Sequence, residues 1–105
     1  MTLTAIQEAV LELTGITKEE LAGKSRKRSL VNARQIYCGL ARKLTDRSWV
    51  DISQVIKKDH ATAIYHAKMA DVFIQNEKKF RQKYFECLDN LVHQDEMFYT
   101  YIDEY

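Results

Sequence analysis

Residues 48–67 read SWVDISQVIKKDHATAIYHA, and this stretch decides the fold. Two short segments with helical spacing of apolar residues are joined here by the basic pair Lys57-Lys58. Ser48 can cap the first segment through a Ser-x-x-Asp pattern, and Asp59 can cap the second. These features predict a helix-turn-helix, which offers the first residues of its second helix to the base edges of duplex DNA.

The start of that second helix supplies four candidate base-reading residues. Asp59 can accept a hydrogen bond from a cytosine amino group, His60 can donate or accept at a base edge, and the methyl group of Ala61 suits a thymine methyl. Thr62 is the fourth candidate. A lone histidine at a helix start is ordinarily only a polar surface residue. Its position directly after the basic turn favours a role in DNA recognition.

A basic cluster, KSRKR at residues 24–28, precedes the helix-turn-helix in the chain. Because a guanidinium exploits the negative potential of a narrow minor groove, Arg26 and Arg28 are candidates for that groove, with Arg26 assigned to base recognition. A cluster of this kind is often only a solvated loop. The residues that we expect to contact the DNA backbone are Lys24, Lys27, Arg28, Arg34, Gln35, Lys43, Arg47, Ser48, Lys57 and Lys58.

Positive charge is concentrated around these motifs. The formal net charge of the chain is +1, yet residues 18–68 carry +7 and residues 69–105 carry −4. A basic segment that coincides with the recognition motif indicates a polyanionic partner more strongly than the overall charge does. We therefore expect double-stranded DNA as the partner.

The whole chain has the pattern of an all-α helical bundle. It contains no proline, only three separated glycines, and apolar residues that recur every three or four positions. We expect one domain over residues 1–92 and an acidic, aromatic tail over residues 93–105. The expected helices start after a cap at Thr4, after a cap at Thr17, near Val31, after Ser48, after Asp59 and near Glu77.

Aromatic side chains recur at helical spacing, and core packing explains most of them. Tyr65 has a second interpretation, because on the second helix of the motif it can also contact the sugar-phosphate backbone. Cys38 and Cys87 lie within amphipathic patterns and lack neighbours at metal-ligand spacing, so both are expected to pack in the core.

Other functional classes receive little support. Gly23-Lys24-Ser25 imitates the end of a phosphate-binding loop, but Lys18 occupies the position of the required earlier glycine, so we expect no nucleotide site. We also expect no cofactor, no metal and no enzymatic activity. The absence of a long apolar run and of a signal-like start predicts a cytoplasmic protein without a membrane partner, in a bacterial nucleoid or a phage-infected cell.

An ordered series of motifs resembles the C-terminal DNA-binding domain of the bacterial chromosomal replication initiator DnaA. The resemblance covers about residues 15–75 and implies an all-helical, Trp-repressor-like fold. It also implies that Arg26 enters the minor groove while Asp59, His60 and Ala61 read bases beside Thr62. The motifs are Gly23-Lys24-Ser25-Arg26-Lys27-Arg28-Ser29, Ala33-Arg34-Gln35-Ile36, Leu40-Ala41-Arg42-Lys43-Leu44-Thr45, Ser48 with Ile52, Asp59-His60-Ala61-Thr62 and His66-Ala67.

The sequence departs from the family pattern in three respects. The turn before Asp59-His60 is one residue shorter and lacks the family's glycines, so a gapless alignment places Ala61 at the family's histidine. Ala33 replaces a proline. The sequence contains no counterpart of the ATPase module that precedes this domain in the initiator, so we expect DNA binding without a nucleotide switch, in a replication accessory factor or a transcriptional regulator.

One alternative remains, a helical protein-interaction module on the same scaffold. The tail from Gln94 onward combines acids with aromatic residues, and such a segment can dock in a partner's groove or mask the protein's own basic face. A packed end and a disordered end are simpler interpretations of the same tail.

Overall fold

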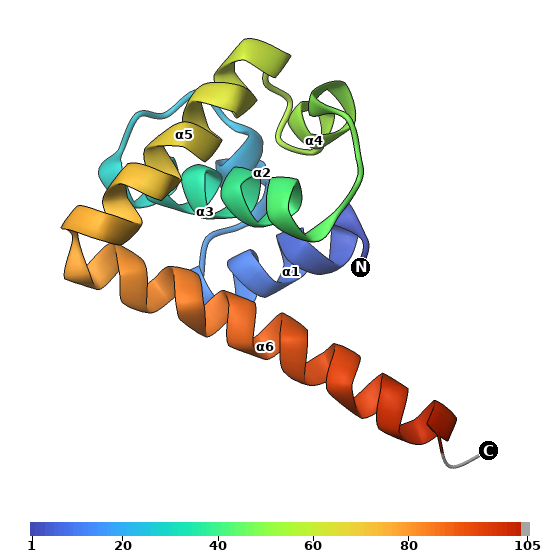
Figure 1. Cartoon of the computed structure of the whole chain (residues 1–105). Coiled ribbons are helices and arrows are strands. Elements are labelled where there is room, and N and C mark those ends of the chain that lie inside the picture. Colours follow the sequence, from blue (N-terminus) through green and yellow to red (C-terminus); the bar gives the residue numbers. More distant parts are fainter. Residues whose placement is uncertain (104–105) are drawn as a thin grey trace.

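Six helices account for most of the chain that the computed structural model describes, which is the backbone of residues 1–103 and the side chains of residues 1–93. They are α1 (Leu3–Thr14), α2 (Lys18–Ala22), α3 (Arg28–Leu44), α4 (Trp49–Val55), α5 (His60–Asn76) and α6 (Lys78–Asp103). Figure 1 shows α1 to α5 gathered into one body, with α6 running across it. No strand occurs in residues 1–103, which confirms the all-α prediction.

Local capping signals set three helix starts where the sequence predicts them. Thr17 Oγ1 accepts from Glu20 N while Glu20 Oε1 accepts from Thr17 N, both at 3.1 Å, which completes a capping box. Ser48 Oγ accepts from Asp51 N at 3.1 Å at the start of α4. Asp59 Oδ1 accepts from Thr62 N at 2.7 Å at the start of α5. The boundaries of the helix-turn-helix therefore follow from short-range chemistry.

Two predicted helix starts and one helix end are wrong. Thr2, not Thr4, caps α1, because Thr2 Oγ1 accepts from Ala5 N at 3.0 Å. Helix α3 begins at Arg28 rather than near Val31, so Arg28, the last residue of the basic cluster, belongs to its first turn. Helix α6 continues to Asp103, past residue 92, where the helical domain was expected to end.

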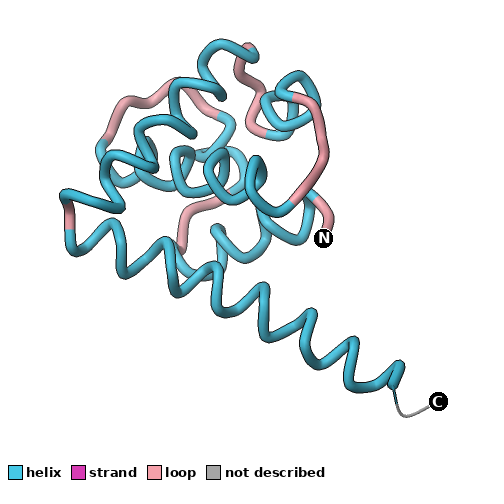
Figure 2. The backbone as a smooth tube through the Cα atoms, viewed as in Figure 1, coloured by secondary structure: helices cyan, strands magenta, loops and turns pink. Residues whose placement is uncertain are grey.

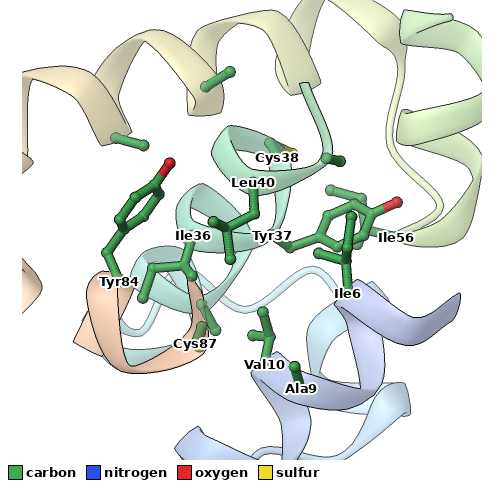
Figure 3. Close-up of a cluster of buried hydrophobic side chains, with 14 of the residues drawn as sticks. Ile6, Ala9, Val10, Ile36, Tyr37, Cys38, Leu40, Ile56, Tyr84 and Cys87 are labelled. Atoms are coloured by element: carbon green, nitrogen blue, oxygen red, sulfur yellow. The ribbon is translucent and has the colours of Figure 1, made fainter. Parts of the chain in front are cut away.

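The core is built around α3, which contacts α1, α2, α4, α5 and α6. Every residue from Ala33 to Ala41 is buried. Figure 3 shows Ile36, Tyr37 and Leu40 of α3 meeting side chains from the neighbouring helices. The phenol of Tyr37 donates to the Ile52 carbonyl at 3.0 Å, which joins α3 to the first helix of the helix-turn-helix.

Both cysteines lie in this core. Cys38 and Cys87 are buried and form no disulfide, which confirms the packing role predicted for them. Burial raises the pKa of the Cys38 thiol to about 12, and burial followed by the charge of Glu86 raises that of Cys87 to about 11. Both thiols are therefore protonated and unreactive at neutral pH.

A close crossing of α3 and α5 brings the second helix of the motif against the core. A Cβ atom built on Gly39 lies 3.0 Å from the Ala70 Cβ atom and 3.4 Å from Tyr84 Cε2. Ala70 is itself buried, so the neighbour cannot move into solvent. Glycine at this position sets how near α5 lies to α3.

We expect Gly39→Ala to lower the free energy of unfolding by up to about 2 kcal/mol. Overpacking of a tight core destabilises the fold by about 1–3 kcal/mol, and the better helix propensity of alanine offsets about 1 kcal/mol of this loss. Urea denaturation measures the change. Adding Ala70→Gly makes room for the new methyl group, so the double variant should lose less than the sum of the single losses. Simple additivity would refute the close contact.

The last described element is a long helix that leaves the body. Figure 2 shows α6 extending beyond the other helices as a single helical rod. No helix in the described part of the chain is long and apolar enough to cross a membrane. The acidic aromatic segment of residues 93–105 falls mostly outside the described side chains, so its docking, masking and packing roles stay predictions.

Candidate nucleic-acid interface

The turn between α4 and α5 is tight although it contains no glycine. Lys57 N donates to the Gln54 carbonyl at 3.1 Å, and Lys58 N donates to the Ser53 carbonyl at 3.0 Å. Lys57 has a φ of 53°, in the left-handed region that favours glycine. The shorter turn thus closes with a lysine in a conformation that a glycine would adopt more easily. The exposed Lys57 side chain stands directly before the start of α5.

The first residues of α5 lie on the surface, as base recognition requires. Asp59, His60 and Ala61 are exposed and Thr62 is half-buried, while Ala63 is fully buried beneath them. The capping bond to Thr62 N lowers the pKa of the Asp59 carboxyl. Asp59 therefore carries a negative charge at neutral pH, and its Oδ1 atom accepts the capping hydrogen bond from Thr62 N. The second oxygen can accept from a base amino group.

Tyr65 is not a core residue. Its side chain is 58% exposed, which corrects the core interpretation that the aromatic spacing favours. It lies one turn after Ala61 and one turn before Lys68, which is also exposed. Tyr65 and Lys68 therefore extend the exposed face of α5 beyond its first turn. The sequence analysis missed Lys68, although its spacing from Ala61 and Tyr65 indicates the shared face.

The basic loop is exposed along its whole length and is held from below. Residues 24–28 are all exposed. Beneath them the Arg34 guanidinium donates to the carbonyl of Ser25 at 2.6 Å and to that of Gly23 at 3.0 Å. It also donates to the carbonyls of Leu21 at 2.8 Å and Glu20 at 2.9 Å. One side chain of α3 thus fixes the end of α2 and the start of the loop.

Two residues predicted to contact the DNA backbone are internal. Arg34 is 3% exposed and Gln35 is 4% exposed. Neither residue faces the solvent, which is contrary to the prediction. Arg34 is buried because the chain of residues 20–25 folds over it and presents carbonyl oxygens, which a guanidinium can satisfy. Burial lowers the pKa of Arg34, although arginine remains charged in proteins. Its role is to position the loop.

Lys58 links the turn of the helix-turn-helix to the same loop. Its ammonium group donates to the Gly23 carbonyl and, at 3.3 Å, to the Ala22 carbonyl. Burial, followed by the charges of Arg34 and Lys24, lowers its pKa. Lys58 therefore holds the start of the loop beside the start of α5, in addition to any contact with phosphate.

The far end of the loop lies at the other end of α5. Arg28 forms an ion pair of 2.7 Å with Glu77, the residue that follows α5, and Arg26 lines a shallow hollow with Phe73 and Glu77. Phe73 is 13 residues after His60, which corresponds to about 20 Å along a helix. Half a turn of B-DNA, the distance from a major groove to the adjacent minor groove, is about 17 Å. The spacing suits simultaneous contact with both grooves.

The remaining predicted backbone contacts divide into two groups. Lys24 and Lys27 belong to the exposed loop, and Ser48 is exposed at the start of α4. Lys43 instead pairs with Asp71 at 3.2 Å, about 16 Å along α5 from His60. Arg47 is exposed and lies 3.7 Å from Asp51. Surface pairs of this kind are weak and leave both cations able to exchange partners.

A buried histidine lies where the loop, α3 and α5 meet. His66 is 8% exposed, and its Nδ1 atom makes no hydrogen bond. Burial, followed by the positive charges of Arg34 and Lys58, lowers the pKa of His66. The folded protein therefore favours the neutral form of the His66 imidazole.

We expect the melting temperature to fall as the pH is lowered below about 6.5, the ordinary histidine pKa. Above that pH His66 is neutral in the folded and in the unfolded protein, so it adds nothing to the pH dependence of stability. Below it the unfolded chain binds a proton before the folded protein does, so the free energy of unfolding falls. The fall stops once the pH is below the lowered pKa of His66 in the folded protein. His66→Gln should flatten this dependence, whereas His60→Gln on the exposed face should keep it. Identical pH profiles for the wild type and His66→Gln would refute the assignment.

Comparison with known proteins agrees with this architecture. The family model described as "Bacterial dnaA protein helix-turn-helix" matches residues 3–69, which include α1 to α4, the turn and the first half of α5. Within this match lie both the basic loop and the exposed start of α5.

Individual relatives are chromosomal replication initiator proteins DnaA. The protein of Thermodesulfovibrio yellowstonii is 30% identical over 93 residues, 88% of this chain and 20% of the relative. That of Pelobacter propionicus is 36% identical over 80 residues, 75% of this chain and 18% of the relative. That of Mycobacteroides abscessus is 36% identical over 86 residues, 82% of this chain and 17% of the relative. The chain spans about a fifth or less of the length of these curated relatives. It belongs to the family of bacterial DnaA helix-turn-helix domains.

Proposed function

We propose that this protein binds duplex DNA with the start of α5 in the major groove and the basic loop at the adjacent minor groove. The observation that carries the proposal is the connection between the two parts. Lys58 and Arg34 both donate to the Gly23 carbonyl, so the loop and the recognition helix are held as one unit. Family membership supports DNA binding itself.

Base recognition is assigned to His60 and Ala61, with the second oxygen of Asp59 and the hydroxyl of Thr62 beside them. Arg26 is assigned to the minor groove. Backbone contacts are assigned to Lys24, Lys27, Lys57, Tyr65 and Lys68, which are exposed on the loop, the turn and α5. Several phosphate contacts of this kind give an affinity that falls steeply with salt.

Fluorescence anisotropy with a labelled duplex of mixed sequence, measured across a salt series, tests this proposal. We expect binding at low salt in the range of about 10–100 μM or tighter, and a log-log salt slope of several units. Binding weaker than about 1 mM at low salt, or an affinity that does not change with salt, would contradict the proposal.

The relatives' name suggests the process in which such binding is used. We infer that the chain recognises a short duplex box, as an accessory factor in replication or as a transcriptional regulator. Selection of preferred duplexes from a random pool followed by mapping of the preferred sequence in the host genome distinguishes these roles. Clustered sites at a replication origin support the first role, and dispersed sites at promoters support the second. A pool that yields no preferred sequence would contradict both.

A further inference from the structure

The first turn and a half of α6 carries a group of positive charges separate from the basic loop. Lys78, Lys79, Arg81 and Lys83 are all the basic residues of residues 69–105. Arg81 donates to the Ile74 carbonyl at 3.2 Å and so helps to join α5 to α6. Among the described residues no ion pair or hydrogen bond engages the side chains of Lys78, Lys79 or Lys83. We name these three lysines the α6 basic surface.

The α6 basic surface borders an open hollow of about 560 Å³ between the first turns of α3 and α6. Arg28, Ser29 and Asn32 of α3 line its other side, and the buried side chains of Ile36 and Phe80 lie at its base. Glu77 is the only acid among the lining residues, and it is already paired with Arg28 at 2.7 Å. The hollow therefore combines unpaired ammonium groups with polar and apolar surface, a combination that suits a sugar-phosphate chain.

The hollow continues the interface proposed above. Arg28, Asn32 and Glu77 line both this hollow and the one that contains Arg26. In Figure 1 the loop between α2 and α3 and the junction of α5 with α6 lie on the same side of the molecule. Glu77 is 17 residues after His60, about 25 Å along α5, or roughly seven base pairs of duplex. Because a minor groove is only about 6 Å wide, its far wall lies close to an inserted Arg26.

We propose that the α6 basic surface binds the phosphodiester backbone on the far side of the minor groove that Arg26 enters. This inference rests on the proposed function. It adds a third contact, so the order along the DNA is base edges at the start of α5, minor groove at Arg26, and phosphates at α6. The family model matches residues 3–69, so the α6 basic surface lies outside the matched segment.

The test compares the wild type with Lys78→Gln/Lys79→Gln/Lys83→Gln on a duplex of about 30 base pairs (about three helical turns) selected from a random pool. Removing up to three phosphate contacts should lower the log-log salt slope by about 2–3. The preference for the selected over a scrambled duplex should stay the same. The matched control is Lys78→Arg/Lys79→Arg/Lys83→Arg, which keeps the charge and should keep the slope.

Hydroxyl-radical footprinting locates the contact. The glutamine variant should lose protection of one strand segment roughly seven base pairs from the bases read by α5, and the arginine variant should retain it. An unchanged slope and footprint would overturn the inference. A second outcome would also overturn it: the wild type binds inorganic phosphate tightly, the glutamine variant does not, and the salt slope for DNA is the same in both. The hollow would then be a site for a free anion and not for DNA. A wild type that shows no salt-dependent binding would instead contradict the proposed function itself.

Discussion

Replacing Arg34 by Met should lower the free energy of unfolding by about 2–4 kcal/mol, because a hydrogen bond to a charged group contributes about 1.5–3 kcal/mol and the four bonds here share one side chain. Loss of the guanidinium removes a donor from four carbonyl oxygens of residues 20–25, and the Gly23 carbonyl then depends on Lys58. The loop can regain water only by moving away from α3. Urea denaturation measures the loss of stability.

The same variant should also weaken DNA binding, although Arg34 is buried and is not among the residues proposed to contact DNA. If Arg34 positions the loop, hydrogen exchange of residues 24–27 should become faster in Arg34→Met under conditions where the protein is still folded. Arg42→Met is the control on the same helix. The Arg42 guanidinium carbon lies 5.0 Å from the centroid of the half-buried Trp49 ring, a contact of about 0.5–1 kcal/mol. Equal losses in the two variants would contradict the role of Arg34.

Arg26→Ala should weaken binding to a selected duplex by about 5- to 150-fold, which corresponds to about 1–3 kcal/mol. Arg26 is exposed and makes no contact that the fold needs, so its removal should leave the melting temperature unchanged. Because the assigned contact lies in a minor groove, the loss should be largest for duplexes with a narrow, A·T-rich groove at that position. Anisotropy with paired duplexes that differ only there measures this.

Two further variants separate groove recognition from charge. Arg26→Lys keeps the positive charge but not the planar guanidinium, so it should keep the salt slope and lose part of the sequence preference. Lys27→Ala should weaken binding equally on all sequences, because a phosphate contact carries no sequence information. If Arg26→Ala and Lys27→Ala behave alike on every duplex, then Arg26 is only another phosphate contact.

Short-range signals explain why the helix-turn-helix was predictable from the sequence. Thr17, Ser48 and Asp59 each cap a helix through an atom three residues away, so neither tertiary packing nor a partner is needed to place them. The buried face of α5 follows from the spacing of Ala63, Ala67 and Ala70. His60 shares the spacing of that face, so its exposure follows instead from its place at the first position of the helix, before the buried residues begin.

Long-range packing explains what the sequence did not reveal. Arg34 has the composition of a surface residue, and only the folding of residues 20–25 over α3 makes it internal. Tyr65 shares helical spacing with core residues, and its exposure depends on which side of α5 meets α3. The conformation of Lys57 and the bond from Lys58 to the loop likewise arise when α2, the loop and the turn come together. Assignment of individual base contacts therefore stays a prediction.

We propose that the start of α5 distinguishes bases in the major groove, Arg26 enters the minor groove, and the lysines of the loop and the turn supply sequence-independent contacts with phosphates. The most direct measurement is the ratio of affinities for a selected and a scrambled duplex, determined across a salt series for the wild type and His60→Ala. The account predicts a wild-type ratio of about 10³ or more, a ratio reduced by about 5- to 150-fold in His60→Ala, and the same salt slope for both proteins. A wild-type ratio near one, or a His60→Ala variant that keeps the full ratio, would contradict it.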